Sequence, residues 1–187
     1  MKSKDFLRLP LTLLIICAVC TALVVAAHDY TAGIIASRQA AEIDAAYKQI
    51  FPELGKLEKI SAPPDSPIRE VHRSARGSGF NGYIYTVAAK GYAGEISLMV
   101  GIAYPSMKIT GVRILSQKET PGLGSKCTEP AFLDQFTGKD LHRNLEVSKK
   151  AGSPQEIQAI TASTITSRAI VDGINLASAH FRSNYLK

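Results

Sequence analysis

The pattern of apolar positions separates one end of the chain from the rest. From Leu9 to Ala27 the sequence is apolar and carries no charge. A helix rises 1.5 Å per residue, so this run spans roughly 28 Å, close to the hydrocarbon thickness of a bilayer. The pattern therefore predicts one N-terminal transmembrane helix over residues 9–27.

Charged residues around this run predict its orientation. Basic residues precede it, at Lys2, Lys4 and Arg8. The positive-inside rule then keeps residues 1–8 in the cytoplasm and puts the chain after Ala27 outside. A cleaved signal peptide is the alternative, since Val25-Ala26-Ala27 could serve as a small-residue cleavage site. The length of the run favours a retained anchor.

A second stretch has helical rather than continuous apolar spacing. From Thr31 to about Leu57, small and apolar residues recur at the period of a helix, which we expect to end near Phe51-Pro52. Leu54–Ile60 is expected to add a short turn. Residues 28–60 are thus predicted to connect the membrane helix to a domain over 61–187, which begins with a loop over 61–67.

Beyond the loop, the period changes to that of strands. Three β-rich segments joined by short turns predict an antiparallel meander, namely Tyr83–Ala88, Glu95–Tyr104 and Lys108–Leu115. Later segments predict a short helix over Pro130–Phe136 stopped by Gly138, a strand over Leu145–Ser148 and a helix from about Thr166. The predicted fold is α+β, an antiparallel sheet with flanking helices.

Composition and charge limit the classes of function that fit this chain. The chain has 187 residues, a net charge of +6 and 20% charged residues, which fits one folded domain plus an anchor. Its basic residues are scattered without a nucleic-acid-binding signature, and its four histidines lack metal-ligand spacing. Cys17 and Cys20 are read as small apolar residues of the membrane helix, although their Cys-x-x-Cys spacing also occurs in redox sites. Cys127 is expected to be buried and inert.

Hydroxyl side chains crowd the start of the last predicted helix. They belong to Thr161, Ser163, Thr164, Thr166 and Ser167. The first N–H groups of a helix are unpaired and its dipole favours negative charge, so this cluster could hold a phosphate. Helix capping is the alternative, because Ser and Thr are preferred caps without any ligand.

An acidic, glycine-containing loop is the second candidate. It reads Glu119-Thr120-Pro121-Gly122-Leu123-Gly124. Pro121 and Gly122 favour a tight turn, and Gly122 and Gly124 would let the backbone approach a flat ligand. Glu119 could accept a hydrogen bond from that ligand. An ordinary surface turn explains the same composition.

The order of several motifs adds a resemblance to a family. The motifs are 91–96 (GYAGEI), 111–115 (GVRIL), 119–124 (ETPGLG), 136–139 (FTGK) and 161–167 (TASTITS). In this order they resemble the FMN-binding G subunit of the Rnf ion-translocating electron transport complex. They also resemble its relative, the C subunit of the sodium-pumping NADH:quinone reductase. The resemblance extends along the whole chain, anchor included.

This resemblance implies one covalently bound FMN. In the family a threonine carries FMN through its phosphate, and the matching residue here is Thr164. Phosphate contacts are then expected from Thr161, Thr166 and Ser167, and Ser163 is expected to belong to the same cofactor site. Contacts to the flavin ring or its tail are expected from Glu119, Thr120, Gly122, Leu123 and Gly124. No acid–base catalyst and no metal is implied.

The resemblance also implies a place in a complex. The chain would relay electrons in a bacterial cytoplasmic-membrane assembly that couples ferredoxin/NAD electron transfer to Na⁺ or H⁺ movement. Its partners would be a second flavinylated membrane subunit, iron–sulfur subunits, ferredoxin- and NAD-reacting subunits, and a flavin transferase. Gln117, Gln158, Ala162 and Ser163 depart from the family pattern. These departures permit a structural or assembly subunit with a degenerate flavin site as an alternative. A quinone reductase subunit is a separate alternative.

Overall fold

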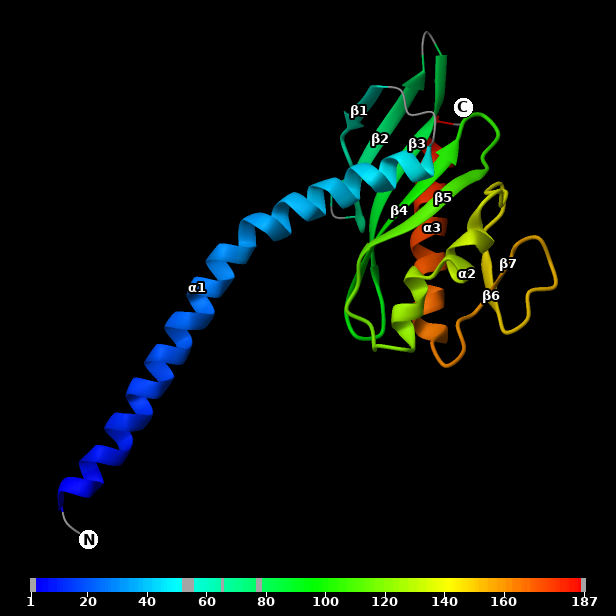
Figure 1. The fold of residues 1–187 in the computed structure, drawn as a ribbon. Helices are drawn as coiled ribbons and strands as arrows, with labels where there is room; N and C mark the ends of the chain where they lie inside the picture. Colours follow the sequence, from blue (N-terminus) through cyan, green and yellow to red (C-terminus); the bar gives the residue numbers. More distant parts are fainter. Residues whose placement is uncertain (1–2, 52–55, 65, 77–78, 186–187) are drawn as a thin grey trace. The chain divides into compact units, whose positions relative to one another are not determined.

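The computed structural model describes residues 3–51, 56–64, 66–76 and 79–185 (Figure 1). Residues 1–2 of the predicted tail, part of the predicted turn over 54–60, Asp65 of the predicted loop and residues 186–187 lie outside these ranges. The chain forms two compact units, Met1–Ile43 and Asp44–Lys187. The second unit thus includes the later half of the predicted connecting segment.

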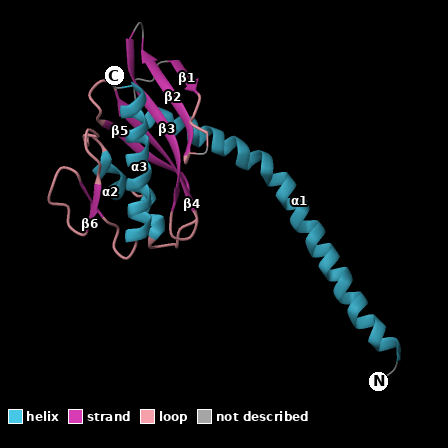
Figure 2. Cartoon of the chain, turned by 180° about the vertical axis from the view of Figure 1, so that it is seen from behind, coloured by secondary structure: helices cyan, strands magenta, loops and turns pink. Residues whose placement is uncertain are grey.

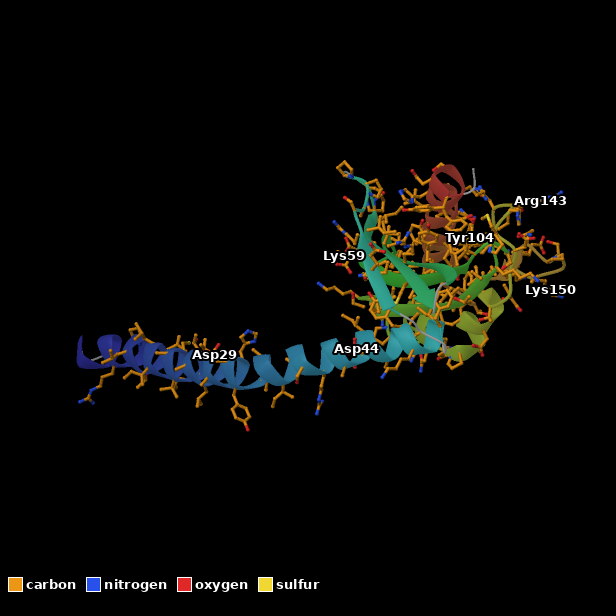
Figure 3. The ribbon with its side chains drawn as sticks, turned by 90° about the horizontal axis from the view of Figure 1, so that it is seen from above. Asp29, Asp44, Lys59, Tyr104, Arg143 and Lys150 are labelled. Atoms are coloured by element: carbon orange, nitrogen blue, oxygen red, sulfur yellow. The ribbon has the colours of Figure 1, made fainter. Side chains whose placement is uncertain are left out.

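Helix α1 spans Ser3–Ile50 and carries the predicted apolar run. Its segment Pro10–Ile35 is long and apolar enough to cross a membrane, a test that a signal sequence would also pass. None of its most apolar window is buried, and Asp29 lies on this segment (Figure 3). Because the apolar residues surround the helix rather than forming one stripe, no single protein face could bury them.

The second unit is built on a five-stranded antiparallel sheet in which each strand pairs with the next along the chain. The strands are β1 (Lys56–Ile60), β2 (Ile68–Arg76), β3 (Gly79–Lys90), β4 (Glu95–Ala103) and β5 (Ile109–Ser116). The predicted three-stranded meander is confirmed as β3, β4 and β5. Two further strands, β1 and β2, extend it.

These two strands lack a clear sequence signal. The predicted helical turn is wrong for Lys56–Ile60, which form β1 instead. Strand β2 contains an irregularity between Ile68 and Glu70, which breaks the alternation that identifies a half-buried strand. Opposite charges meet across this pair, where Lys59 contacts Glu70 and Arg73 contacts Glu58. Pairing of β2 with β3, and of β1 with β2, rather than local preference, decides the two strands.

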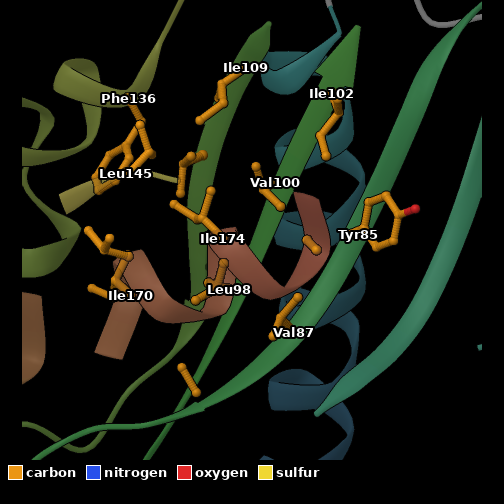
Figure 4. Close-up of a cluster of buried hydrophobic side chains, with 14 of the residues drawn as sticks. Tyr85, Val87, Leu98, Val100, Ile102, Ile109, Phe136, Leu145, Ile170 and Ile174 are labelled. Carbon is orange, nitrogen blue, oxygen red and sulfur yellow. The ribbon is translucent and has the colours of Figure 1, made fainter. Parts of the chain in front are cut away.

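Helix α3 (Thr164–Tyr185) packs on one face of the sheet (Figure 2). Its apolar stripe, which includes Ile170, Ile174 and Phe181, is fully buried. It meets the alternating positions Leu98, Val100 and Ile102 of β4 in the main core, part of which Figure 4 shows. The predicted helical and strand periods are therefore both realised in one interface.

The opposite face of the sheet is covered by the last turns of α1. Ala46, Ile50 and Phe51 pack against Ile84 of β3 and Met99 of β4. Glycines in the sheet make room for them. A Cβ on Gly101 would lie 2.2 Å from Ile50 Cγ2, and one on Gly82 would lie 2.6 Å from Phe51 Cζ. Burial on this face fixes the end of α1 to the second unit.

Smaller elements complete the α+β fold, which confirms the predicted class. They are the 3₁₀-helices η1 (Gly124–Thr128) and η2 (Asp134–Phe136), helix α2 (Pro130–Leu133), and strands β6 (Glu146–Ser148) and β7 (Glu156–Gln158). The predicted helix over 130–136 is thus a short α-helix continued as a 3₁₀ turn. Strands β6 and β7 pair in parallel.

Candidate functional site

The loop Glu119–Gly124 folds into a tight turn. The backbone N–H groups of Leu123 and Ser125 both donate to the carbonyl of Thr120, each over 3.2 Å. Gly122 has a φ of 75°, a conformation that favours glycine, and its N–H donates to Ser125 Oγ over 2.9 Å. The turn geometry predicted from Pro121 and Gly122 is confirmed.

Glu119 ties this turn to two other elements. Its side chain is buried, and its Oε1 accepts a hydrogen bond of 2.9 Å from the N–H of Ala93 in the β3–β4 turn. Its Oε2 accepts the hydroxyl proton of Thr166 in α3. Gln117 supports the arrangement by accepting the N–H of Glu119 over 2.6 Å. Each carboxylate oxygen therefore already has one protein donor, so Glu119 acts as a clamp between loop, turn and helix.

Two glycines leave space for this carboxylate. A Cβ on Gly91 would lie 2.5 Å from Glu119 Oε1. A Cβ on Gly124 would lie 2.7 Å from Glu119 Oε2 and 2.9 Å from Thr166 Oγ1. The lack of a side chain at Gly124 therefore makes room for the Glu119 carboxylate, and not only for a ligand that approaches the loop.

The start of α3 uses part of its hydroxyl cluster internally. Ser167 Oγ accepts the N–H of Ile160 over 2.9 Å and donates to the carbonyl of Ser163 over 3.0 Å. Both serines are buried. Ala162, just before the helix, has a φ of 61°. This left-handed conformation disfavours an alanine, and the resembled motif has glycine at the same position.

Loop and helix start enclose a pocket of about 540 Å³, which we call the loop pocket. Seven predicted site residues line it: Glu119, Thr120, Leu123, Gly124, Ser163, Thr164 and Thr166. Three do not, and these are Thr161, Gly122 and Ser167. Tyr92 and Ile165 line it as well and were missed, because an exposed tyrosine in a turn and an isoleucine within a hydroxyl cluster carry no distinctive signal.

Exposed apolar side chains surround the loop pocket. Tyr92 is 70% exposed, Ile165 57% and Leu123 43%. Monomeric domains bury most large apolar residues, so three of them around one hollow suit an apolar ligand or a protein surface. Among the described residues that line this pocket, Glu119 is the only charged one.

Cys127 lies below the loop, in η1, and is fully buried as predicted. Burial, reinforced by the nearby Glu119 carboxylate, raises the pKa of its thiol to about 11. The thiol therefore stays protonated near neutral pH, which makes it a poor nucleophile and metal ligand.

The loop pocket suits an organic cofactor better than a metal. Its volume lies within the range of roughly 300–1,000 Å³ typical of ligand sites. Thr164 is exposed, is the first residue of α3 and carries a hydroxyl that a covalent attachment could use. Within the described ranges no cluster of His, Cys, Asp or Glu could hold a metal ion.

Comparison with known proteins agrees with this geometry. Residues 91–179 match the family model of the FMN-binding domain, which includes both the loop and the start of α3. The G subunit of the Na⁺-translocating ferredoxin:NAD⁺ oxidoreductase complex of Acetobacterium woodii is 34% identical over 93% of this chain and 90% of its own length. The G subunit of the ion-translocating oxidoreductase complex of Methanosarcina acetivorans is 29% identical, over 94% of each chain.

Solved structures share the fold. The C subunit of the Na⁺-translocating NADH-quinone reductase of Parabacteroides distasonis superposes with a TM-score of 0.53 at 24% identity, over 63% of this chain and 62% of that chain. NqrC of Shewanella oneidensis gives a TM-score of 0.51 at 22% identity, over 69% and 67%. With the extent and identity of the sequence matches, the chain belongs to the family formed by the G subunits of ion-translocating oxidoreductase complexes.

Proposed function

We propose that this chain is the membrane-anchored, FMN-carrying electron-transfer subunit of an ion-translocating oxidoreductase complex. One FMN is attached through its phosphate to Thr164. The observation that carries the proposal is the position of Thr164, an exposed threonine at the border of the loop pocket inside the segment matched by the FMN-binding domain. When bound, the flavin supplies one- and two-electron chemistry.

The residues of the loop pocket would hold and orient the flavin. Tyr92, Leu123 and Ile165 offer apolar surface to a planar ring. Glu119 fixes the relative positions of the loop, the β3–β4 turn and α3 through its bonds to Ala93 and Thr166. The covalent bond would keep the cofactor in place through repeated redox cycles.

The finer assignments follow the curated relatives. The Acetobacterium woodii relative is a subunit of a complex that moves Na⁺, and the Clostridium ljungdahlii relative, 28% identical, belongs to a complex that moves protons. We propose that this chain relays electrons between ferredoxin and NAD within such a complex, with a second flavinylated subunit, iron–sulfur subunits and a flavin transferase as partners. The second compact unit lies outside the cytoplasmic membrane, held by α1.

Intact mass spectrometry of the full chain tests the attachment. Wild-type chain purified from cells that contain the flavin transferase should weigh one FMN more, less one water, than the polypeptide alone. Thr164→Val should remove this gain completely, because valine has no hydroxyl to form the ester. Thr137→Val is the matched control and should keep the gain, since Thr137 is also exposed but does not line the loop pocket.

Two results would contradict the proposal. A gain in mass that persists in Thr164→Val would place the flavin on another residue. A wild-type chain without any gain would favour the structural subunit, for which the strained Ala162 is a specific reason.

A further inference from the structure

Thr164 borders two hollows rather than one. One is the loop pocket. The other, which we call the cation pocket, has a volume of about 230 Å³ and is lined by Lys90, Thr164, Ile165, Arg168, Ala169 and Asp172. Since Thr164 and Ile165 line both, a group attached to Thr164 could extend into either hollow.

The two hollows differ in charge. The described lining of the loop pocket contains one charged side chain, the buried Glu119, and no lysine or arginine. The cation pocket contains Lys90 and Arg168 against the single carboxylate of Asp172. A phosphoester carries negative charge, so Glu119 would repel it in the loop pocket whereas the two cations would attract it. The neutral, planar ring of a flavin would instead favour the loop pocket.

Local geometry brings both cations to Thr164. Arg168 follows Thr164 by four residues on α3, which puts them on one face of the helix. Helical side chains lean toward the N-terminus, so Arg168 leans toward Thr164. Lys90 is the last residue of β3 and reaches the same hollow from the sheet. In the described part of the chain, neither side chain forms an ion pair or hydrogen bond.

We infer that the two hollows divide the cofactor, with the phosphate held by Lys90 and Arg168 in the cation pocket and the flavin ring in the loop pocket. The inference rests on the proposed attachment of FMN to Thr164. With this division, Lys90 and Arg168 contact the phosphate in place of Thr161, Thr166 and Ser167. The hydroxyl protons of Thr166 and Ser167 are already donated to Glu119 and to the carbonyl of Ser163.

Binding of free flavins to the full chain carrying Thr164→Val tests the division, because this variant cannot form the ester. We expect FMN to bind more tightly than riboflavin, which lacks the phosphate. Lys90→Gln and Arg168→Gln should each weaken FMN about threefold, as befits exposed ion pairs. Together they should abolish the preference for FMN and leave the riboflavin affinity unchanged. Arg113→Gln, at an exposed position of β5 that lines neither pocket, is the matched control.

An FMN preference that survives the double variant would overturn the inference. If the valine variant binds neither flavin, chemical modification of the flavin-loaded wild-type chain decides instead. Loading should protect Lys90 from acetylation and Arg168 from arginine-specific reagents, relative to Thr164→Val, and leave Arg113 unprotected. Equal reactivity in a loaded chain would overturn this inference alone. A wild-type chain whose mass shows no flavin would overturn the proposed function together with it.

Discussion

Helix α3 buries its hydrophobic side chains against the sheet, whereas the apolar part of α1 leaves them exposed. In α3, Ile170, Ile174 and Phe181 are completely buried against the sheet. In α1, Leu14 is 64% exposed and Val24 68%. The difference lies in distribution, because α3 gathers its apolar residues on one stripe and α1 carries them all round. One protein face can cover a stripe, whereas a helix that is apolar all round needs apolar surroundings on every side, which a lipid bilayer provides.

The largest expected effect comes from removing the lipid-dependent part. A chain that lacks residues 1–43 keeps the whole second unit and loses the candidate span Pro10–Ile35. It should move completely from the membrane fraction to the soluble fraction and keep a cooperative thermal unfolding transition. Fractionation followed by circular dichroism measures both. Retention of the shortened chain in washed membranes would mean that the second unit binds the membrane by itself.

Removing eight more residues should lower the stability of the second unit, unlike removal of the apolar part of α1. A chain that lacks residues 1–51 also loses Ala46, Ile50 and Phe51, which cover the second face of the sheet. Burying an isoleucine or phenylalanine side chain contributes about 1.5–3 kcal/mol, so the free energy of unfolding should fall by about 3–6 kcal/mol relative to the first truncation. Denaturant titration of the two soluble chains compares them. Equal stability would show that the end of α1 is dispensable to the fold.

A single truncation in α3 should have a smaller effect. Phe181→Ala removes a fully buried ring from the contact with Tyr83 and Tyr185, and should lower the free energy of unfolding by about 3–5 kcal/mol. Ile165→Ala, at an exposed position of the same helix, should change it by less than about 0.5 kcal/mol. Similar losses in the two variants would contradict the one-stripe description of α3.

The smallest effect concerns the entry into α3. Ala162→Gly should raise the free energy of unfolding by about 1 kcal/mol, because glycine tolerates the φ of 61° that strains alanine. The reverse change at the other site turn, Gly122→Ala at a φ of 75°, should lower it by about the same amount. Thermal unfolding of the second unit can resolve both. A loss of stability in Ala162→Gly would show that the left-handed conformation is not what limits this turn.

The sequence predicted best the elements whose signals are local. The continuous apolar run of α1, the alternation of β4 and the helical period of α3 each depend on residues close together in the chain. The turn at Gly122 and the hydroxyl-rich start of α3 also follow from local preferences. Strands β1 and β2 escaped prediction because β1 is short and charged and β2 is irregular, so that only pairing defines them, β2 with β3 and β1 with β2.

The residues by themselves determined the apolar anchor, the fold class and the two segments that form the candidate site. Only the tertiary structure decided that Glu119 contacts Thr166 of another element and that Lys90 of β3 lines the same pocket as Thr164 and Arg168. The physical reason is the range of the interactions. Backbone preferences and periodicity act within a few residues, whereas these contacts join segments that meet only when α3 packs on the sheet.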